Sequence, residues 1–141
     1  MGRAVRALDA RAYVLDAQPV VVFFHEEAGA DVVRALLTAA REGRTQLRMT
    51  VVNAGEVLLV QERSGGPAAS HAALDLLQAL PIEIVPVDLE LAARAAYLKG
   101  RGGISYADCF SGALAMRDGV PLLTADPEFE RIADLVEIAW L

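Results

Sequence analysis

Short apolar runs alternate with amphipathic stretches along almost the whole chain. Five runs have the length and composition of buried strands, at residues 13–15, 47–52, 82–87, 121–124 and 136–141. The stretches between them carry helical signals, such as the spacing of three and four between apolar side chains within residues 29–41. Strands that alternate with helices are typical of a parallel sheet covered on both faces. We therefore predict a three-layer α/β/α sandwich with a mostly parallel central sheet of about five strands.

Start and stop signals define most of the other helices. Pro19 suits the first turn of a short helix reaching residue 25, although the valines and phenylalanines there would also suit a strand. Residues 64–67 (SGGP) are predicted to break the helix that follows Asn53. Residues 99–103, with three glycines, are predicted to form a flexible turn. Further helices are predicted over residues 68–80, 88–98 and 105–116, with a short last one from residue 126.

Composition favours one compact domain over residues 1–141, with residues 1–12 as a possible N-terminal arm. Of the 141 residues, 55% are hydrophobic and 23% charged, enough for a substantial core. Cys109 is the single cysteine, so no intrachain disulfide can form. The aliphatic and aromatic run at residues 20–24 is too short to span a bilayer, and the N-terminus does not resemble a signal peptide. We expect a cytoplasmic protein without membrane association.

Acidic residues recur where predicted strands end and helices begin. Asp16 ends the first strand, Glu56 follows the second, and Asp126 follows the fourth. Asp108 lies in the first turn of a predicted helix. Carboxyl ends of parallel strands share one edge, so these side chains can converge there. Clustered carboxylates repel one another unless a hard divalent cation neutralises them, and such a centre suits phosphodiester hydrolysis.

Helix capping is the alternative explanation for these acids. Residues 53–56 and 105–108 both fit a capping box, with Asn53 and Ser105 as N-caps. Asp126 before a proline is a common N-cap arrangement. Asp16 is harder to dismiss in this way than the other acids, because a charge directly after a buried strand needs a partner. Four acids at one predicted edge favour a joint site over independent caps.

Four segments resemble the motifs of PIN domains in order and spacing. They are residues 13–17 (YVLDA), 53–57 (NAGEV), 104–110 (ISYADCF) and 122–129 (LLTADPEF). The resemblance covers nearly the whole chain. It implies Mg²⁺- or Mn²⁺-dependent cleavage of RNA, and many compact members of the family are VapC-type toxins. Such toxins are usually homodimers held inactive by a cognate antitoxin protein.

The resemblance also implies roles for individual residues. The acidic site would consist of Asp16, Glu56, Asp108 and Asp126. Asp16 and Asp108 would bind the metal directly, and the other two would act through water. Thr124 would orient a carboxylate or a water, and Asn53 could do the same. Gln18 departs from the pattern, since the family commonly has a small hydroxyl residue at this position.

Basic residues provide candidate RNA contacts even though the formal net charge is −6. Lys99 and Arg101 are the best candidates, because their glycine-rich segment leads into the helix that carries Asp108. His25 is interpreted as a surface residue. Cys109 is interpreted as a small buried hydrophobic residue.

Three other functions remain open beside the one that the resemblance implies. A PIN-like nuclease of RNA processing or repair would use the same acids, and a catalytically idle binding or dimerisation module would keep only the fold. A response-regulator domain also places acids at strand ends. It is disfavoured because no lysine follows a late strand.

Overall fold

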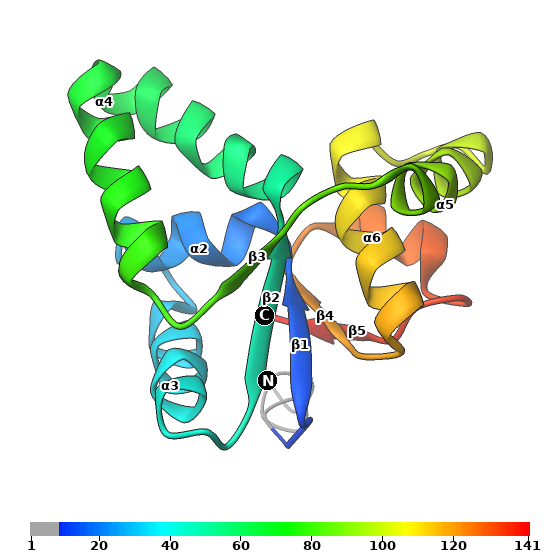
Figure 1. Ribbon diagram of the computed structural model, residues 1–141, viewed down its shortest axis with the longest axis horizontal. Helices are drawn as coiled ribbons and strands as arrows, with labels where there is room; N and C mark the ends of the chain where they lie inside the picture. The colour runs from blue at the N-terminus through cyan, green and yellow to red at the C-terminus, as the bar shows by residue number, and fades with distance from the viewer. Residues whose placement is uncertain (1–8) are drawn as a thin grey trace.

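The computed structural model describes residues 9–141 and shows a five-stranded, entirely parallel sheet with helices on both faces (Figure 1). The elements follow one another as β1 (Ala12–Leu15), α2 (Ala17–Phe24), α3 (Ala30–Arg41), β2 (Gln46–Thr50), α4 (Val51–Ala79), β3 (Glu83–Val85), α5 (Leu89–Gly100), α6 (Tyr106–Asp118), β4 (Leu122–Thr124), the 3₁₀ helix η1 (Pro127–Ile132) and β5 (Ile138–Trp140). The predicted three-layer α/β fold is confirmed. Most of the proposed N-terminal arm lies outside the described residues.

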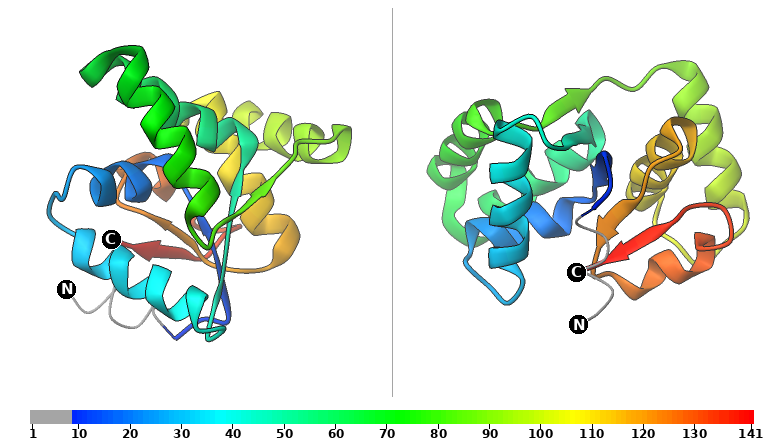
Figure 2. Two further views of the ribbon diagram at one scale, coloured as in Figure 1. Left: turned by 60° about the vertical axis from the view of Figure 1, so that its left-hand side comes forward. Right: turned by 90° about the horizontal axis from the view of Figure 1, so that it is seen from below.

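Two hydrophobic cores lie on opposite faces of the sheet. Side chains alternate along β1, so that Tyr13 and Leu15 face one core while Val14 faces the other. Helices α2, α3 and α4 cover the first face, and α5, α6 and η1 cover the second (Figures 1 and 2). Both faces of the sheet are therefore buried, as expected for parallel strands.

Strand order places a topological switch point between β1 and β4. The order across the sheet is β3-β2-β1-β4-β5. The chain moves outward from β1 through β2 to β3, then returns to the other side of β1 for β4 and β5. The connections on the two sides of this point lie on opposite faces, which opens the carboxyl edge between β1 and β4.

Several predicted boundaries shift in the structure. The second strand ends at Thr50 rather than residue 52, because helix α4 begins at once with Thr50 as its N-cap. The third and fifth strands are only three residues long, since each pairs over three residues with one neighbour at an edge of the sheet. Helix α5 continues to Gly100, so the predicted flexible turn is shorter.

Helix α4 is kinked where the SGGP segment predicted a break. Gly66 has φ 80° and ψ −176°, a conformation essentially confined to glycine, and Pro67 follows it. The two halves of α4 meet at an angle at the top of Figure 1 and descend toward different parts of the sheet. The chain thereby returns to start β3.

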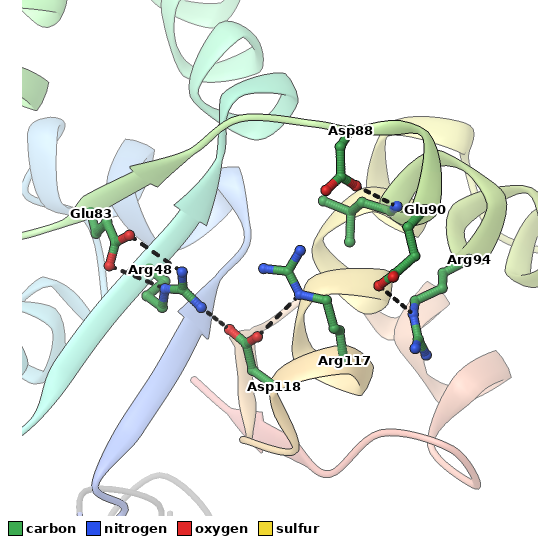
Figure 3. A network of polar contacts seen from close by, with 8 residues as sticks. Arg48, Glu83, Asp88, Glu90, Arg94, Arg117 and Asp118 are labelled. Carbon is green, nitrogen blue, oxygen red and sulfur yellow. Dashed lines mark hydrogen bonds and ion pairs between the residues drawn. The ribbon is translucent and has the colours of Figure 1, made fainter.

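An ion-pair network anchors the C-terminal end of α6 to the sheet (Figure 3). Arg48 on β2 bonds to Glu83 on β3 at 3.2 Å and also pairs with Asp118, the last residue of α6. Arg117 lies 3.3 Å from the same aspartate. The first turn of α6 lies at the opposite end of this helix, toward the carboxyl edge of the sheet.

Candidate active site

Asp16 lies at the junction of β1 and α2, between the two cores. Only 3% of the residue is exposed. Its Oδ2 accepts a hydrogen bond of 3.1 Å from the Thr124 hydroxyl on neighbouring β4. Its Oδ1 is buried and has no hydrogen-bond partner among residues 9–141. A buried carboxylate oxygen without a donor is costly, so this atom is suited to binding a cation.

Asp108 lies in the first turn of α6 and is 7% exposed. Ser105 is the N-cap of this helix, and its hydroxyl accepts from the Asp108 N–H at 3.2 Å, which confirms the predicted cap. In a capping box the Ser105 N–H would donate to the Asp108 carboxylate. Here it donates to the Glu128 carboxylate instead, at 3.0 Å. The Asp108 carboxylate instead takes part in the acidic cluster.

Glu56 is positioned by a hydrogen-bonded chain at the start of α4. The predicted N-cap role of Asn53 is wrong, because Thr50 occupies that position and accepts from the Asn53 N–H at 3.1 Å. Asn53 is fully buried within the first turn. Its amide group donates to Glu56 Oε1 and to the Ala107 carbonyl oxygen, each at 3.0 Å. This side chain thereby links the glutamate to the start of α6.

Asp126 is the N-cap of η1, as predicted, with Oδ1 accepting from the Glu128 N–H at 2.9 Å. Its own N–H donates to the Thr124 hydroxyl at 3.0 Å. Thr124 therefore connects two of the acids through one hydroxyl group. In addition, Gln18 accepts from the Ala125 N–H at 2.9 Å. Side chains thus hold both N–H groups that follow β4.

The structure brings the four predicted acids together. Oxygen atoms of Asp16, Glu56 and Asp108 lie within 4.8 Å of one another, and a second set within the same limit contains Asp108, Asp126 and Glu128. All four line a cleft of about 230 Å³. Lys99 and Arg101 do not line it: Lys99 bonds to the Ile104 carbonyl oxygen at 2.9 Å, and Arg101 pairs with Asp134 at 2.9 Å.

The electrostatics of the cluster favour a bound cation. Burial is the main cause that raises the pKa of Asp16 to about 7, and the nearby Glu56 carboxylate contributes to the same shift. Burial also raises the pKa of Asp108 to about 8, with the charge of Asp16 as the next cause. A hard divalent cation prefers such oxygen donors and relieves their repulsion. The donor set and the unpartnered Asp16 Oδ1 therefore fit a divalent metal.

Two residues of this region were not predicted as part of the site. Glu128 is one, and its position two residues after Asp126 at the start of a helix was the available signal. Gln18 is the other, and its departure from the family pattern was the available signal. Cys109 is buried and burial raises its pKa to about 11, which agrees with a structural role. His25 is exposed and bonds to Gln61.

The fold and site define an α/β/α protein with a cluster of carboxylates, suited to a divalent metal, at the switch point of a parallel sheet. The family model of the PIN domain matches residues 13–135, and the chain belongs to the PIN-domain family. A VapC ribonuclease of Mycobacterium bovis is 33% identical over 134 residues, covering 89% of this chain and 98% of the relative. A ribonuclease VapC of Mycolicibacterium smegmatis is 30% identical over 133 residues, with the same coverage.

Solved structures share this fold at lower identity. Mycobacterium tuberculosis VapC20, described as a sarcin-ricin loop cleaving toxin, has a TM-score of 0.71 and 18% identity, covering 90% of this chain and 98% of its own. A DNA-bound VapBC of Salmonella typhimurium has a TM-score of 0.70 and 16% identity, covering 92% and 97%. No helix within residues 9–141 is long and apolar enough to cross a membrane.

Proposed function

We propose that this chain is a metal-dependent endoribonuclease that cleaves RNA phosphodiester bonds as the toxin of a VapBC-type pair. One observation carries the chemistry: four carboxylates from separate elements line one cleft, and a buried oxygen of Asp16 among them has no donor within residues 9–141. The VapC ribonucleases that match nearly the whole chain support RNA as the substrate.

Each acid has a separate role in this proposal. Asp16 and Asp108 hold Mg²⁺ or Mn²⁺ directly, while Glu56 and Asp126 contact it through water. When bound, the metal supplies a water of lowered pKa and stabilises the leaving oxygen. Thr124 keeps the Asp16 carboxylate oriented by donating to Oδ2. Metal-bound carboxylates are commonly fixed by such outer hydrogen bonds.

Asn53 keeps Glu56 in place without competing for the metal. Its amide group donates both hydrogen bonds, to Glu56 Oε1 and to the Ala107 carbonyl oxygen. These bonds hold the start of α4 against the start of α6. An aspartate at this position would have no N–H to donate. The neutral amide therefore holds one carboxylate without adding another negative charge to the cluster.

The proposed partners are a cognate antitoxin and a second copy of this chain, with the protein in the cytoplasm. Helix α3 and the second half of α4 offer surfaces for them. Leu74 and Leu76 on α4 are 38% and 49% exposed, so this half of the helix presents apolar side chains that a partner could cover. A monomer at high concentration in solution would contradict the homodimer.

A cleavage assay tests the enzymatic activity. Purified protein is incubated with a panel of structured RNAs and Mg²⁺ or Mn²⁺, with and without EDTA. We expect cleavage that EDTA abolishes, and losses of at least about 100-fold in Asp16→Asn and Asp108→Asn, because each removes a metal-binding oxygen. Asp75→Asn, an exposed acid on α4, is the matched control. Metal-independent activity, or full activity of Asp108→Asn, would contradict the assignment.

An expression assay tests the toxin role. Induction of the wild-type chain should arrest growth of a bacterial host, and co-expression of its cognate antitoxin, sought as a small DNA-binding protein encoded by an adjacent gene, should restore growth. Asp16→Asn should be harmless at equal abundance. Growth that continues while the purified enzyme cleaves RNA would instead support a nuclease of RNA processing or repair.

A further inference from the structure

The cleft beside the acidic cluster offers an anionic substrate very few hydrogen-bond donors. Its walls consist of the four carboxylates, three apolar side chains and one amide; the apolar residues are Ala17, Val21 and Val60, and the amide is Gln18. No lysine, arginine or histidine from residues 9–141 lines it. Gln18 is therefore the lining side chain that carries N–H donors.

The Gln18 side chain is held in one orientation. It extends from the first turn of α2 and its Oε1 accepts from the Ala125 N–H at 2.9 Å. A backbone N–H pairs only with the carbonyl end of an amide, so this bond also determines where the NH₂ end lies. Within residues 9–141, the structure records no hydrogen bond donated by Nε2. The NH₂ group thus remains available to a molecule in the cleft.

We propose that Gln18 is a substrate-binding residue whose NH₂ group donates to a non-bridging phosphate oxygen of the RNA, beside the metal-binding acids. This inference rests on the proposed ribonuclease function. A metal neutralises the charge of the phosphate, and a directional donor fixes how the phosphate is turned.

The chemistry of the cleft favours an amide over a basic side chain here. A lysine or arginine at this position would pair with Asp16 or Asp108 and compete with the metal for them. A neutral amide donates to phosphate without that competition. Glutamine is also long enough to keep its bond to Ala125, which the small hydroxyl residue usual in the family is too short to reproduce.

Three variants separate substrate binding from a purely structural role. Gln18→Met removes both hydrogen bonds without changing charge. Gln18→Glu keeps the acceptor for the Ala125 N–H but has no N–H to donate. Val60→Glu is the matched control, because it adds the same charge to the same cleft without touching Ala125. RNA binding is measured by the fluorescence anisotropy of a fluorescein-labelled uridine oligoribonucleotide in the presence of Ca²⁺. In parallel, calorimetry measures the affinity of each variant for Mn²⁺, and thermal unfolding measures its stability.

We expect Gln18→Met to weaken RNA binding roughly tenfold, the effect of one hydrogen bond to a charged group, at unchanged Mn²⁺ affinity. Gln18→Glu should weaken it at least as much while unfolding at the wild-type temperature. Val60→Glu should have a smaller effect.

Two results would overturn the inference and leave the proposed function standing. The first is wild-type RNA affinity in Gln18→Glu with a lowered unfolding temperature in Gln18→Met, which would make Gln18 a structural clamp. The second is an equal loss of RNA affinity in Gln18→Glu and Val60→Glu together with wild-type affinity in Gln18→Met. The added negative charge would then explain the whole loss. Wild-type protein that neither binds nor cleaves RNA would overturn the proposed function, and this inference with it.

Discussion

Asp16 and Asp108 are buried in a way that stability alone does not explain. Each loses hydration on folding, and each lies near another carboxylate, so the ionised form of the cluster destabilises the metal-free fold. Asp16 Oδ1 gains no hydrogen bond among residues 9–141 in return. At the residue scale, therefore, Asp16 and Asp108 have the character of ligand-binding residues rather than of helix caps.

This arrangement predicts a pH-dependent stability. The folded pKa of Asp16, about 7, lies above that of an unfolded aspartate, roughly 4. The folded protein therefore binds more protons between these values, and its free energy of unfolding falls as pH rises through this window. Asp108 extends the window to about pH 8. We expect Asp16→Asn to raise the unfolding temperature of metal-free protein at pH 8 and to change it little at pH 5.

Calorimetry in EDTA at the two pH values measures this effect, with Asp75→Asn as the control. Saturating Mn²⁺ should abolish the advantage of Asp16→Asn, because the wild-type cluster then has its cation. An equal temperature difference at pH 5 and pH 8 would show that ionisation of Asp16 is not responsible.

Thr124 provides a second prediction at this scale. Thr124→Val preserves shape but removes the bond to Asp16 Oδ2 and the acceptor for the Asp126 N–H. We expect destabilisation by about 1–3 kcal/mol and Mn²⁺ affinity roughly tenfold weaker. The pKa of Asp16 should rise further, since the hydroxyl lowers it. Thr124→Ser keeps the hydroxyl and should stay close to wild type; equal losses in both variants would implicate the methyl group instead.

At the scale of elements, three of the four acids of the site lie at or near the N-terminus of a helix. Asp16 occupies the N-cap position of α2 without a capping side-chain bond, Asp108 lies in the first turn of α6, and Asp126 caps η1. These N-termini carry partial positive charge, which favours acids at those positions and helps to tolerate several of them in one place. The kink in α4 matters because it lets a single helical segment supply Glu56 at one end and still return the chain to β3.

Gly66 is therefore a sensitive position in an otherwise tolerant helix. Gly66→Ala should destabilise the protein by about 1–3 kcal/mol, because φ 80° with ψ −176° strains any residue with a Cβ. Gly55→Ala in the same helix is the matched control: its Cβ would meet no heavy atom within 4 Å, and we expect about 0.5–1 kcal/mol of stabilisation. Urea unfolding measures both. Equal effects would show that Gly66 is not strained.

At the scale of the whole molecule, charge opposes the proposed substrate. The net charge is −6, and the cleft is lined by acids, so RNA binding depends on the metal and on a few basic residues outside the cleft. Lys99 and Arg101 remain the predicted contacts, at the end of α5 just before the chain enters α6. Arg101 would have to exchange Asp134 for a phosphate.

Replacing both residues by alanine should weaken RNA binding and reduce the slope of log affinity against log salt by about 1–1.5, since fewer counterions are released. Arg41→Ala with Arg44→Ala is the matched pair, because these residues lie before β2 at the amino edge of the sheet. Anisotropy over a range of salt concentrations provides the slopes. An unchanged slope in the Lys99 and Arg101 variant would place the RNA elsewhere.

The amino-acid sequence by itself determined the five strands, the helices between them, the parallel architecture and the positions of the four acids at strand and helix ends. Ser105 and Asp126 were also predicted correctly as caps. These features depend on periodicity and on side chains that bond to the backbone two or three residues away. Such signals are local, so they can be read without knowing the fold.

Only the tertiary structure decided which atoms meet. Thr50 rather than Asn53 caps α4, because a buried Asn53 amide has partners across the cleft on α6. Glu128 takes the Ser105 N–H, and Gln18 takes the Ala125 N–H 107 residues away. Tertiary packing also leaves Asp16 Oδ1 buried without a hydrogen-bond partner among residues 9–141. Each depends on how closely elements from distant parts of the chain pack, and burial, which sets the pKa values of the acids, exists only once they have packed.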